Sequence, residues 1–210
     1  MKAVTQKIFN ELFENYPILQ GCKENIGEFF DLGIKAYKND KTILVCGNGG
    51  SAADCEHIVG ELMKGFMQKR TLPENENQKF INAGFGEISN KLQRAIPAIS
   101  LVSQTGIITA CANDIDQSMV FAQQVFAYKN IAGLLVAVST SGNSQNALEA
   151  VKIAKFLGIK SVGLLGNDGG EIAKLADCSV IVSENKTHKI QELHLPVYHA
   201  WCAMLEAELF

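Results

Sequence analysis

Residues 42–66 read TILVCGNGGSAADCEHIVGELMKGF and contain the three parts of a strand–turn–helix unit. The apolar run Thr42–Cys46 predicts a strand, Gly47–Ser51 a tight turn, and the residues from about Ala52 onward a helix. A turn of small residues at a helix N-terminus leaves backbone N–H groups free, and these groups and the helix dipole favour an anion. We therefore expect a phosphate group to bind at this turn.

Inside the predicted helix, His57 and Glu61 are four residues apart, so their side chains lie one turn apart on the same face. Such a pair can supply two ligands to one metal ion, or a base and an acid to one substrate. An ordinary i,i+4 pair on the helix surface is the alternative interpretation. The phosphate-type turn just before the helix favours a functional role for the pair.

The composition limits the classes of function. With 210 residues, of which 47% are hydrophobic, the chain can form a single domain, 1–210, with a sizeable core. The net charge of −3 and the lack of basic runs argue against nucleic acid as a partner. No signal-peptide pattern and no run of ~20 apolar residues occurs, so we expect a cytoplasmic protein without a membrane segment.

The six cysteines form no CxxC pair, and we expect them to be reduced and mostly buried.

The rest of the chain alternates helical and strand patterns around one irregular segment. An N-terminal helical segment, 1–40, precedes the first strand. Residues 67–95 then lose periodicity, and we interpret 68–95 as an inserted loop that is a lid, an interface arm or a mobile segment. Further strands are expected at 98–102, 133–138, 160–166 and 179–182, and further helices before Asn113 and at 118–125, 145–157, 171–176 and 187–209. This order predicts an α/β fold, a three-layer αβα sandwich with a parallel sheet whose ligands bind beyond the carboxyl ends of the strands.

A second strand–turn–helix unit repeats the plan of the first. The apolar run Gly133–Val138 leads into Ser139-Thr-Ser-Gly-Asn-Ser144, which carries four hydroxyls. Hydroxyls and turn amides together can surround a phosphate. Capping of the following helix would account for one or two of them, so four hydroxyls within six residues favour phosphate binding.

The last predicted helix, 187–209, carries Gln191, His194 and His199. Gln191 and His199 are about two turns apart, and Pro196 between them lacks a backbone donor and predicts a kink. A lone histidine in a helix is more often a core residue than a ligand. These residues gain weight only in combination with the other motifs.

In combination, the motifs resemble those of sugar isomerase (SIS) domain proteins and, among these, of bacterial phosphoheptose isomerases. The motifs are CGNGGSAAD from Cys46, His57-x-x-x-Glu61-Leu62, Ser139-Thr-Ser-Gly-Asn-Ser144 and Ile190-Gln-Glu-x-His194-x-x-x-x-His199. The resemblance covers nearly the whole chain. It implies a flavodoxin-like subunit with a parallel five-stranded sheet, and a homotetramer with active sites between subunits.

The same resemblance implies an activity and a set of site residues. The family interconverts sedoheptulose 7-phosphate and D-glycero-D-manno-heptose 7-phosphate, on the route to ADP- or GDP-heptose and to the heptose of lipopolysaccharide or related surface glycans. This exchange passes through an enediol, for which Glu61 matches the base and His199 the acid. The positions that match the ligands of one zinc ion per subunit are His57, Glu61, Gln191 and His199. The positions that match substrate contacts are Asn48, Gly49, Ser51, Asp114, Ser139, Thr140, Ser141, Ser144, Thr187 and Gln191.

Three features depart from the family pattern. Residues 62–66 lack an arginine that commonly precedes an aromatic residue, so its phosphate or hydroxyl contact is either lost or supplied by Lys64 or Lys69. The insertion is also longer than usual, and His188 stands where a small or acidic residue is common.

Two other functions stay open. One is a non-catalytic SIS module that binds sugar phosphates or associates with the replication initiator, and the other is an isomerase of a different phosphorylated ketose. The replication-initiator-associating protein lacks the glutamate and the second histidine of the isomerase site. The presence of Glu61 and His199 therefore favours the isomerase.

Overall fold

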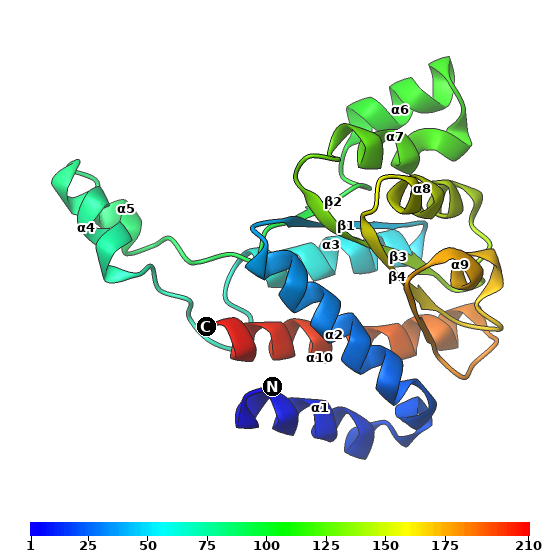
Figure 1. Cartoon of the computed structure of the whole chain (residues 1–210), viewed down its shortest axis with the longest axis horizontal. Helices are drawn as coiled ribbons and strands as arrows, with labels where there is room; N and C mark the ends of the chain where they lie inside the picture. The colour runs from blue at the N-terminus through cyan, green and yellow to red at the C-terminus, as the bar shows by residue number, and fades with distance from the viewer.

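The fold is built on one parallel β-sheet. The computed structural model describes all residues, 1–210, and its strands are β1 (Thr42–Gly47), β2 (Ala98–Ser100), β3 (Ala132–Ser139), β4 (Lys160–Leu165) and β5 (Cys178–Ile181). They follow the spatial order β2-β1-β3-β4-β5, and every neighbouring pair is parallel. The predicted α/β fold with a five-stranded parallel sheet is confirmed (Figure 1).

Helices cover both faces of the sheet. They are α1 (Ala3–Asn15), α2 (Lys23–Lys38), α3 (Gly50–Met63), α4 (Glu74–Asn82), α5 (Gly86–Ser89), α6 (Thr105–Asp114), α7 (Val120–Ala127), α8 (Gln145–Phe156), α9 (Gly170–Leu175) and α10 (Thr187–Leu209), with short 3-10 turns η1 (Pro17–Cys22) and η2 (Gln117–Met119). Along β1, Ile43 and Val45 join one apolar cluster while Leu44 and Cys46 join another, because successive side chains point to opposite faces. Helices α1, α2, α3 and α10 complete the first cluster, and α6, α7 and α8 the second.

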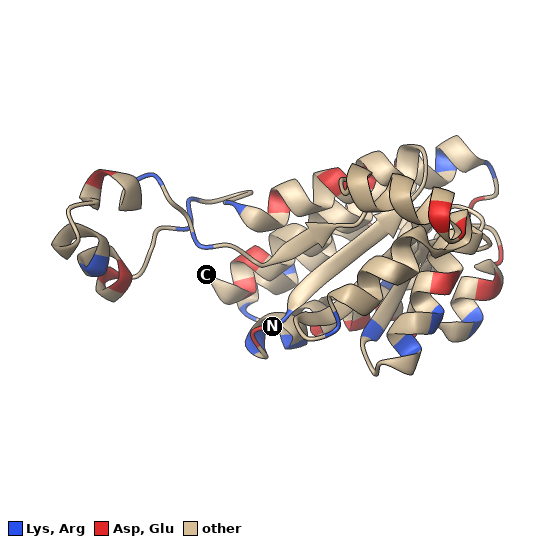
Figure 2. Cartoon of the chain, turned by 90° about the horizontal axis from the view of Figure 1, so that it is seen from above, with Lys and Arg blue, Asp and Glu red and all other residues tan.

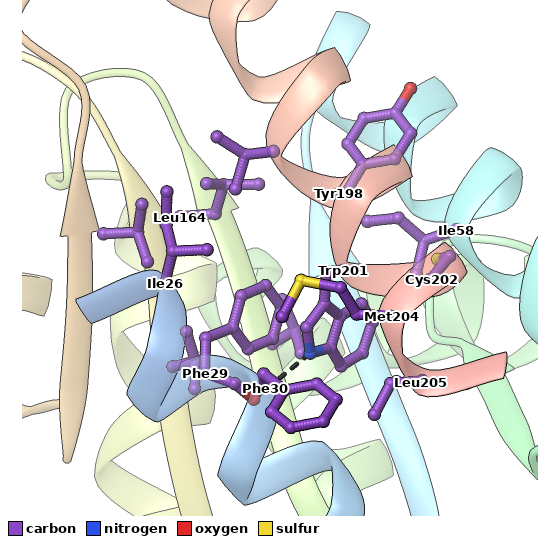
Figure 3. Close-up of a cluster of buried hydrophobic side chains, with 14 of the residues drawn as sticks. Ile26, Phe29, Phe30, Ile58, Leu164, Tyr198, Trp201, Cys202, Met204 and Leu205 are labelled. Atoms are coloured by element: carbon purple, nitrogen blue, oxygen red, sulfur yellow. Dashed lines mark hydrogen bonds between the residues drawn. The ribbon is translucent and has the colours of Figure 1, made fainter. Parts of the chain in front are cut away.

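Helix α10 lies at the centre of the first cluster (Figure 3). Its Trp201 stacks on Phe29 of α2 with ring centroids 4.1 Å apart, and the indole Nε1 donates to the carbonyl oxygen of Phe29 at 3.1 Å. Both side chains are fully buried, and the bond satisfies the one polar atom of the indole. The helix continues through Pro196. The packing around Trp201 therefore fixes α10 against α2.

The segment 68–95 differs from the predicted loop because it contains two helices, α4 and α5. They form a small unit that projects from the body of the molecule (Figures 1 and 2). Pro73, at the N-cap, is followed by Glu74 and Glu76 in the first turn of α4, which is a helix-start signal that the polar run 74–78 obscured. No residue of α4 is buried. We call residues 71–92 the arm.

Three further observations concern the whole chain. All six cysteines are buried and none forms a disulfide, which agrees with the prediction from their spacing. None of the helices is both long enough and apolar enough to cross a lipid bilayer. Acidic and basic residues are interspersed over the elements of the fold (Figure 2).

Candidate active site

The glycine-rich turn after β1 is shaped by close contacts on both sides. A Cβ atom on Gly47 would lie 2.8 Å from the carbonyl oxygen of Ser51 and 2.9 Å from that of Val138 in β3. A Cβ atom on Gly50 would lie 2.5 Å from Nε2 of Gln191. Gly49 has a positive φ of 57°, which non-glycine residues rarely adopt. The glycines thus let β1, β3 and α10 meet at this turn, and Gln191 lies directly against it.

Three of the predicted site residues come together beside this turn. On α3, His57 Nε2 is 3.3 Å from Glu61 Oε1, and His199 Nε2 on α10 is 3.4 Å from the same His57 nitrogen. His57 and Glu61 are therefore not an isolated pair on the helix surface, because α10 adds His199 from a distant part of the chain. Lys64 Nζ lies 3.1 Å from the other carboxylate oxygen of Glu61.

The distances in this cluster bear on metal binding. Ligand atoms at about 2.0–2.2 Å from a tetrahedral zinc ion lie roughly 3.3–3.5 Å from one another. The separations from His57 Nε2 to Glu61 and to His199, 3.3 and 3.4 Å, have this length. Nevertheless, no group of three or more histidine, cysteine, aspartate and glutamate side chains is arranged in the structure so that it could hold a metal ion. The two separations are thus compatible with ligand spacing, and they do not by themselves define a metal site.

The electrostatic surroundings favour a neutral imidazole at His199. Partial burial lowers the pKa of His199, and the nearby His57 lowers it further, against the opposite effect of Glu61. The neutral form is the one that ligates a metal or presents a single N–H to an oxygen atom. Glu61 is the more enclosed partner, with 16% of its side chain exposed against 43% for His57.

The serine turn after β3 uses several of its hydroxyls internally. Ser139 Oγ is 3.1 Å from Ser144 Oγ and accepts from the Gly142 N–H at 3.2 Å. Ser141 Oγ accepts from the Asn143 N–H at 3.2 Å. The alternative role of these hydroxyls, capping of the following helix, is not seen at Ser144, which stands at the N-cap of α8 and makes no side-chain bond to the helix. These hydroxyls stabilise the turn through bonds within it. They could contact a ligand only by donating an additional hydrogen bond.

The two turns are joined by a reciprocal amide pair. Asn48 Nδ2 donates to Asn146 Oδ1 at 2.7 Å, and Asn146 Nδ2 donates to Asn48 Oδ1 at 3.0 Å. Asn48 and Ser144 line a common cavity of about 480 Å³. Ser141 instead lines a wholly polar cavity of about 820 Å³ with residues that follow β4 and β5. These two cavities thus lie at the carboxyl ends of the strands, where ligands of parallel sheets bind.

Two predicted residues lie apart from this group. Asp114 is exposed at the end of α6 and accepts from the Asn113 side chain at 2.8 Å, whereas it is Asp116 that lines the cavity with Asn48. Thr187 is the exposed first residue of α10. Within this single chain, neither is brought to the His57–Glu61–His199 cluster.

The structure also reveals residues that sequence reasoning missed. Arg70 is fully buried; its Nε bonds Glu206 Oε1 at 2.7 Å, and its guanidinium donates to the carbonyl oxygens of Leu62 at 2.7 Å and of Glu61 at 3.2 Å. The buried cation of this segment is therefore Arg70, while Lys69 is exposed. No local sequence pattern marks Arg70, because its partner Glu206 is 136 residues away.

Two further missed residues, Asp54 and Tyr198, lie behind His57. The Tyr198 hydroxyl is 3.1 Å from His57 Nδ1 and donates to Asp54 Oδ1 at 3.2 Å. Burial raises the pKa of Tyr198 and that of Asp54, although the bond from Tyr198 and the charge of His57 act on Asp54 in the opposite direction. The tyrosine is therefore a neutral donor at ordinary pH.

Comparisons with known proteins concern the family of the chain. Residues 17–94 match the family model described as SIS domain. The chain is 39% identical over 173 residues to a phosphoheptose isomerase of Nitratiruptor sp., covering 82% of this chain and 80% of that protein, and 34% identical over 192 residues to one of Aliarcobacter butzleri, covering 91% and 89%.

Solved structures give the same result. A phosphoheptose isomerase from Neisseria gonorrhoeae matches with a TM-score of 0.72 at 30% identity, covering 98% of this chain and all of that one. One from Francisella tularensis matches with a TM-score of 0.76 at 26% identity, covering 99% and 100%. Sequence relatives and structures thus agree over nearly the full length of both partners, and the chain belongs to the phosphoheptose isomerase family of SIS domain proteins.

Proposed function

We propose that the protein is an aldose–ketose isomerase that converts sedoheptulose 7-phosphate into D-glycero-D-manno-heptose 7-phosphate, for the biosynthesis of nucleotide-activated heptose. The observation that carries the proposal is the approach of Glu61 and His199, from α3 and α10, to the same nitrogen of His57. A carboxylate and a neutral imidazole at one point are the two proton-transfer groups that the reaction needs. Family membership supplies the substrate class.

In the proposed mechanism, Glu61 moves the carbon-bound proton. Its carboxylate takes one proton from C1 of the open-chain ketose, while the N–H of His199 gives a proton to the oxygen on C2, which yields the enediol. Glu61 then delivers its proton to C2, and the hydroxyl proton on O1 returns to His199 as the aldehyde forms. Each group ends the cycle in its initial protonation state, so no external acid or base is consumed.

We further propose that His57, Glu61, Gln191 and His199 hold one zinc ion per subunit. The proposal is supported by the two ligand-type separations around His57 Nε2 and by the nitrogen and oxygen donor set. A bound zinc ion would supply Lewis-acid polarisation of substrate oxygens. Metal analysis of the purified protein and of His57→Ala tests the ligand set independently of turnover.

The remaining site residues are proposed substrate contacts. The backbone amides of Gly49 and of the α3 N-terminus, with the Ser51 hydroxyl, suit an anionic group. The proposed sugar and phosphate contacts are Asn48, Asp114, Ser139, Thr140, Ser141, Ser144, Thr187 and Gln191. Ser141→Ala should raise the Michaelis constant, and an unchanged constant would remove this residue from the phosphate site.

The proposed assembly is a cytoplasmic homotetramer with active sites between subunits. Support comes from Asp114 and Thr187, which do not reach the cluster of their own chain, and from exposed apolar side chains on α6 and α7 such as Ile107 and Phe126. Light scattering of the purified protein would measure the mass, and a monomeric mass would contradict the assembly.

The direct test is incubation with sedoheptulose 7-phosphate, with and without added zinc, followed by NMR of the product. We expect the aldose 7-phosphate to form, and Glu61→Gln to lower kcat by roughly 10²–10⁴-fold because it removes the base. Glu192→Gln is the matched control, since Glu192 is exposed on α10 and pairs with Lys189 at 2.7 Å. Full turnover by Glu61→Gln would refute the base. Saturable binding of sugar phosphates without turnover would place the chain among the non-catalytic SIS modules.

A further inference from the structure

The side of His57 that faces away from Glu61 and His199 is also hydrogen-bonded. His57 Nδ1 is 3.1 Å from the hydroxyl of Tyr198, and that hydroxyl donates to Asp54 Oδ1 at 3.2 Å. Asp54 and His57 lie on α3, while Tyr198 precedes His199 on α10. The three side chains form a linear series, Asp54 to Tyr198 to His57, which ends at the proposed reaction centre.

The direction of each bond in this series is determined by proton counting. A tyrosine hydroxyl has one proton, and it is directed at Asp54 Oδ1. The hydroxyl oxygen can therefore act only as an acceptor toward His57, so the proton on that side of the imidazole must reside on Nδ1. In the neutral imidazole, Nε2 then carries the lone pair, and this is the atom 3.3 Å from Glu61 Oε1 and 3.4 Å from His199 Nε2.

We propose that Asp54 and Tyr198 are positioning residues that hold His57 in the Nδ1–H tautomer, with the Nε2 lone pair directed at the Glu61–His199 cluster. The neutral Nδ1–H imidazole is the form that can offer Nε2 to a metal ion or to a hydrogen-bond donor at that cluster.

The series of Asp54, Tyr198 and His57 lowers the stability of the fold at one atom, and a purely structural role would not require this loss. Asp54 Oδ2 is buried without a hydrogen-bond partner, and a buried polar atom left unpaired is destabilising. Tyr198 is 1% exposed and its ring packs edge-on against His57, with centroids 5.5 Å apart. Packing accounts for the ring but not for the hydroxyl, so the bond between Tyr198 and His57 can be removed while the packing is kept.

The tautomer is measured directly on the protein without metal or substrate. Nitrogen-15 NMR of the histidine side chains distinguishes Nδ1–H from Nε2–H, and we expect His57 to be the Nδ1–H form in the wild type. In Tyr198→Phe, His57 should lose this preference and shift toward a mixture of tautomers. Tyr37→Phe is the matched control, because the Tyr37 ring also packs edge-on, against Phe210, while its hydroxyl has no bond to the cluster.

A second readout connects the tautomer to the proposed metal site, and this part rests on the proposed function. Loss of a group that orients a histidine ligand lowers metal affinity by roughly 10–100-fold, so competition with a chromophoric chelator should show weaker zinc binding by Tyr198→Phe than by Tyr37→Phe. Asp54→Asn should also disturb the tautomer, because an amide can donate to the Tyr198 hydroxyl and reverse its direction.

The outcomes separate the two proposals. A wild-type His57 in the Nε2–H form, or a Tyr198→Phe protein that keeps the Nδ1–H form completely, would overturn the positioning role. A tautomer that shifts as expected in a protein without heptose phosphate turnover would support the positioning role while refuting the proposed function.

Discussion

The arm and its attachment to the body form one continuous segment of sequence, yet they differ completely in their surroundings. At the attachment, which we call the neck (residues 65–70), Arg70 is fully buried and ion-paired with Glu206. In the arm, no residue of α4 is buried, and Phe85 is 56% exposed. An insertion can therefore be part of the packed core where it leaves the body, and can lack contacts with the body only a few residues later.

The neck is held by a nearly saturated set of hydrogen bonds. Glu206 accepts from the backbone N–H groups of Phe66, Met67 and Gln68 at 2.7–3.1 Å as well as from Arg70. Burial alone would raise the pKa of Glu206, but these donors outweigh it, and the pKa is lowered. Arg70 in turn satisfies two carbonyl oxygens at the C-terminal end of α3, which have no partner within the helix. Because one of them belongs to Glu61, the neck also supports the proposed catalytic helix.

The largest expected effect comes from breaking the neck. Arg70→Met removes the cation beside the buried Glu206 carboxylate, which keeps only its backbone N–H donors. Removal of one member of a buried ion pair costs about 3–5 kcal/mol. Urea denaturation followed by circular dichroism would measure the free energy of unfolding. Lys69→Met is the control, since Lys69 is exposed and surface changes are usually within about 0.5 kcal/mol. A loss below about 1 kcal/mol for Arg70→Met would show that the neck is not a stabilising element.

The second prediction compares stability at different pH values, and it concerns the packed body alone. His194 is 0% exposed, its Nε2 bonds the carbonyl oxygen of Leu165 at 3.1 Å, and its Nδ1 has no partner. Burial lowers the pKa of His194 from 6.5 to about 4. Between these values the unfolded chain binds a proton that the folded chain does not bind, so stability falls as the pH decreases.

The expected contribution of His194 is complete above pH 6.5 and is lost, by about 3 kcal/mol, as the pH falls to about 4. His194→Gln keeps an N–H donor for Leu165 but does not titrate, so its stability should depend less on pH across this window. Denaturant titrations at several pH values measure the difference. His188→Gln, at an exposed position of the first turn of α10, is the control and should follow the wild type. Identical pH profiles for His194→Gln and the wild type would contradict the assignment.

The sequence was informative wherever a local pattern determines the structure. Strand β1 is one residue longer than predicted, at its C-terminal end, and β3 is one residue longer at each end. The agreement is this close because continuous apolar runs bounded by glycine and serine turns define buried strands. His57 and Glu61 were placed on one face by helical periodicity alone. His199 joined them only through the family resemblance, which carried long-range information that no periodicity contains.

The failures of prediction have two physical causes. The helices α4 and α5 were missed because they bury almost no surface, so no amphipathic pattern is required of them. The Arg70–Glu206 pair and the Asp54–Tyr198–His57 series were missed because each depends on how α10 packs against α3. Local patterns predict elements, whereas contacts between distant polar residues depend on the assembled core.

The smallest effect is expected in the arm. A helix of nine residues such as α4 has little stability of its own in water, and its amides should exchange with solvent far faster than those of α10, which open only with the core. Phe85→Ser should change the free energy of unfolding by less than about 0.5 kcal/mol, whereas Phe29→Ala, in the core beside Trp201, should cost about 3–5 kcal/mol.

Hydrogen exchange measured at two protein concentrations would show whether the arm is free in solution. Slow exchange in α4 that is independent of concentration would mean that the body itself protects the arm, which would erase the contrast with the neck. Protection that increases with concentration would mean that a second copy covers Phe85 and its exposed neighbours Ile81 and Ile88. In that case the arm would be an interface element, and Phe85→Ser would weaken association while leaving the fold of the subunit intact.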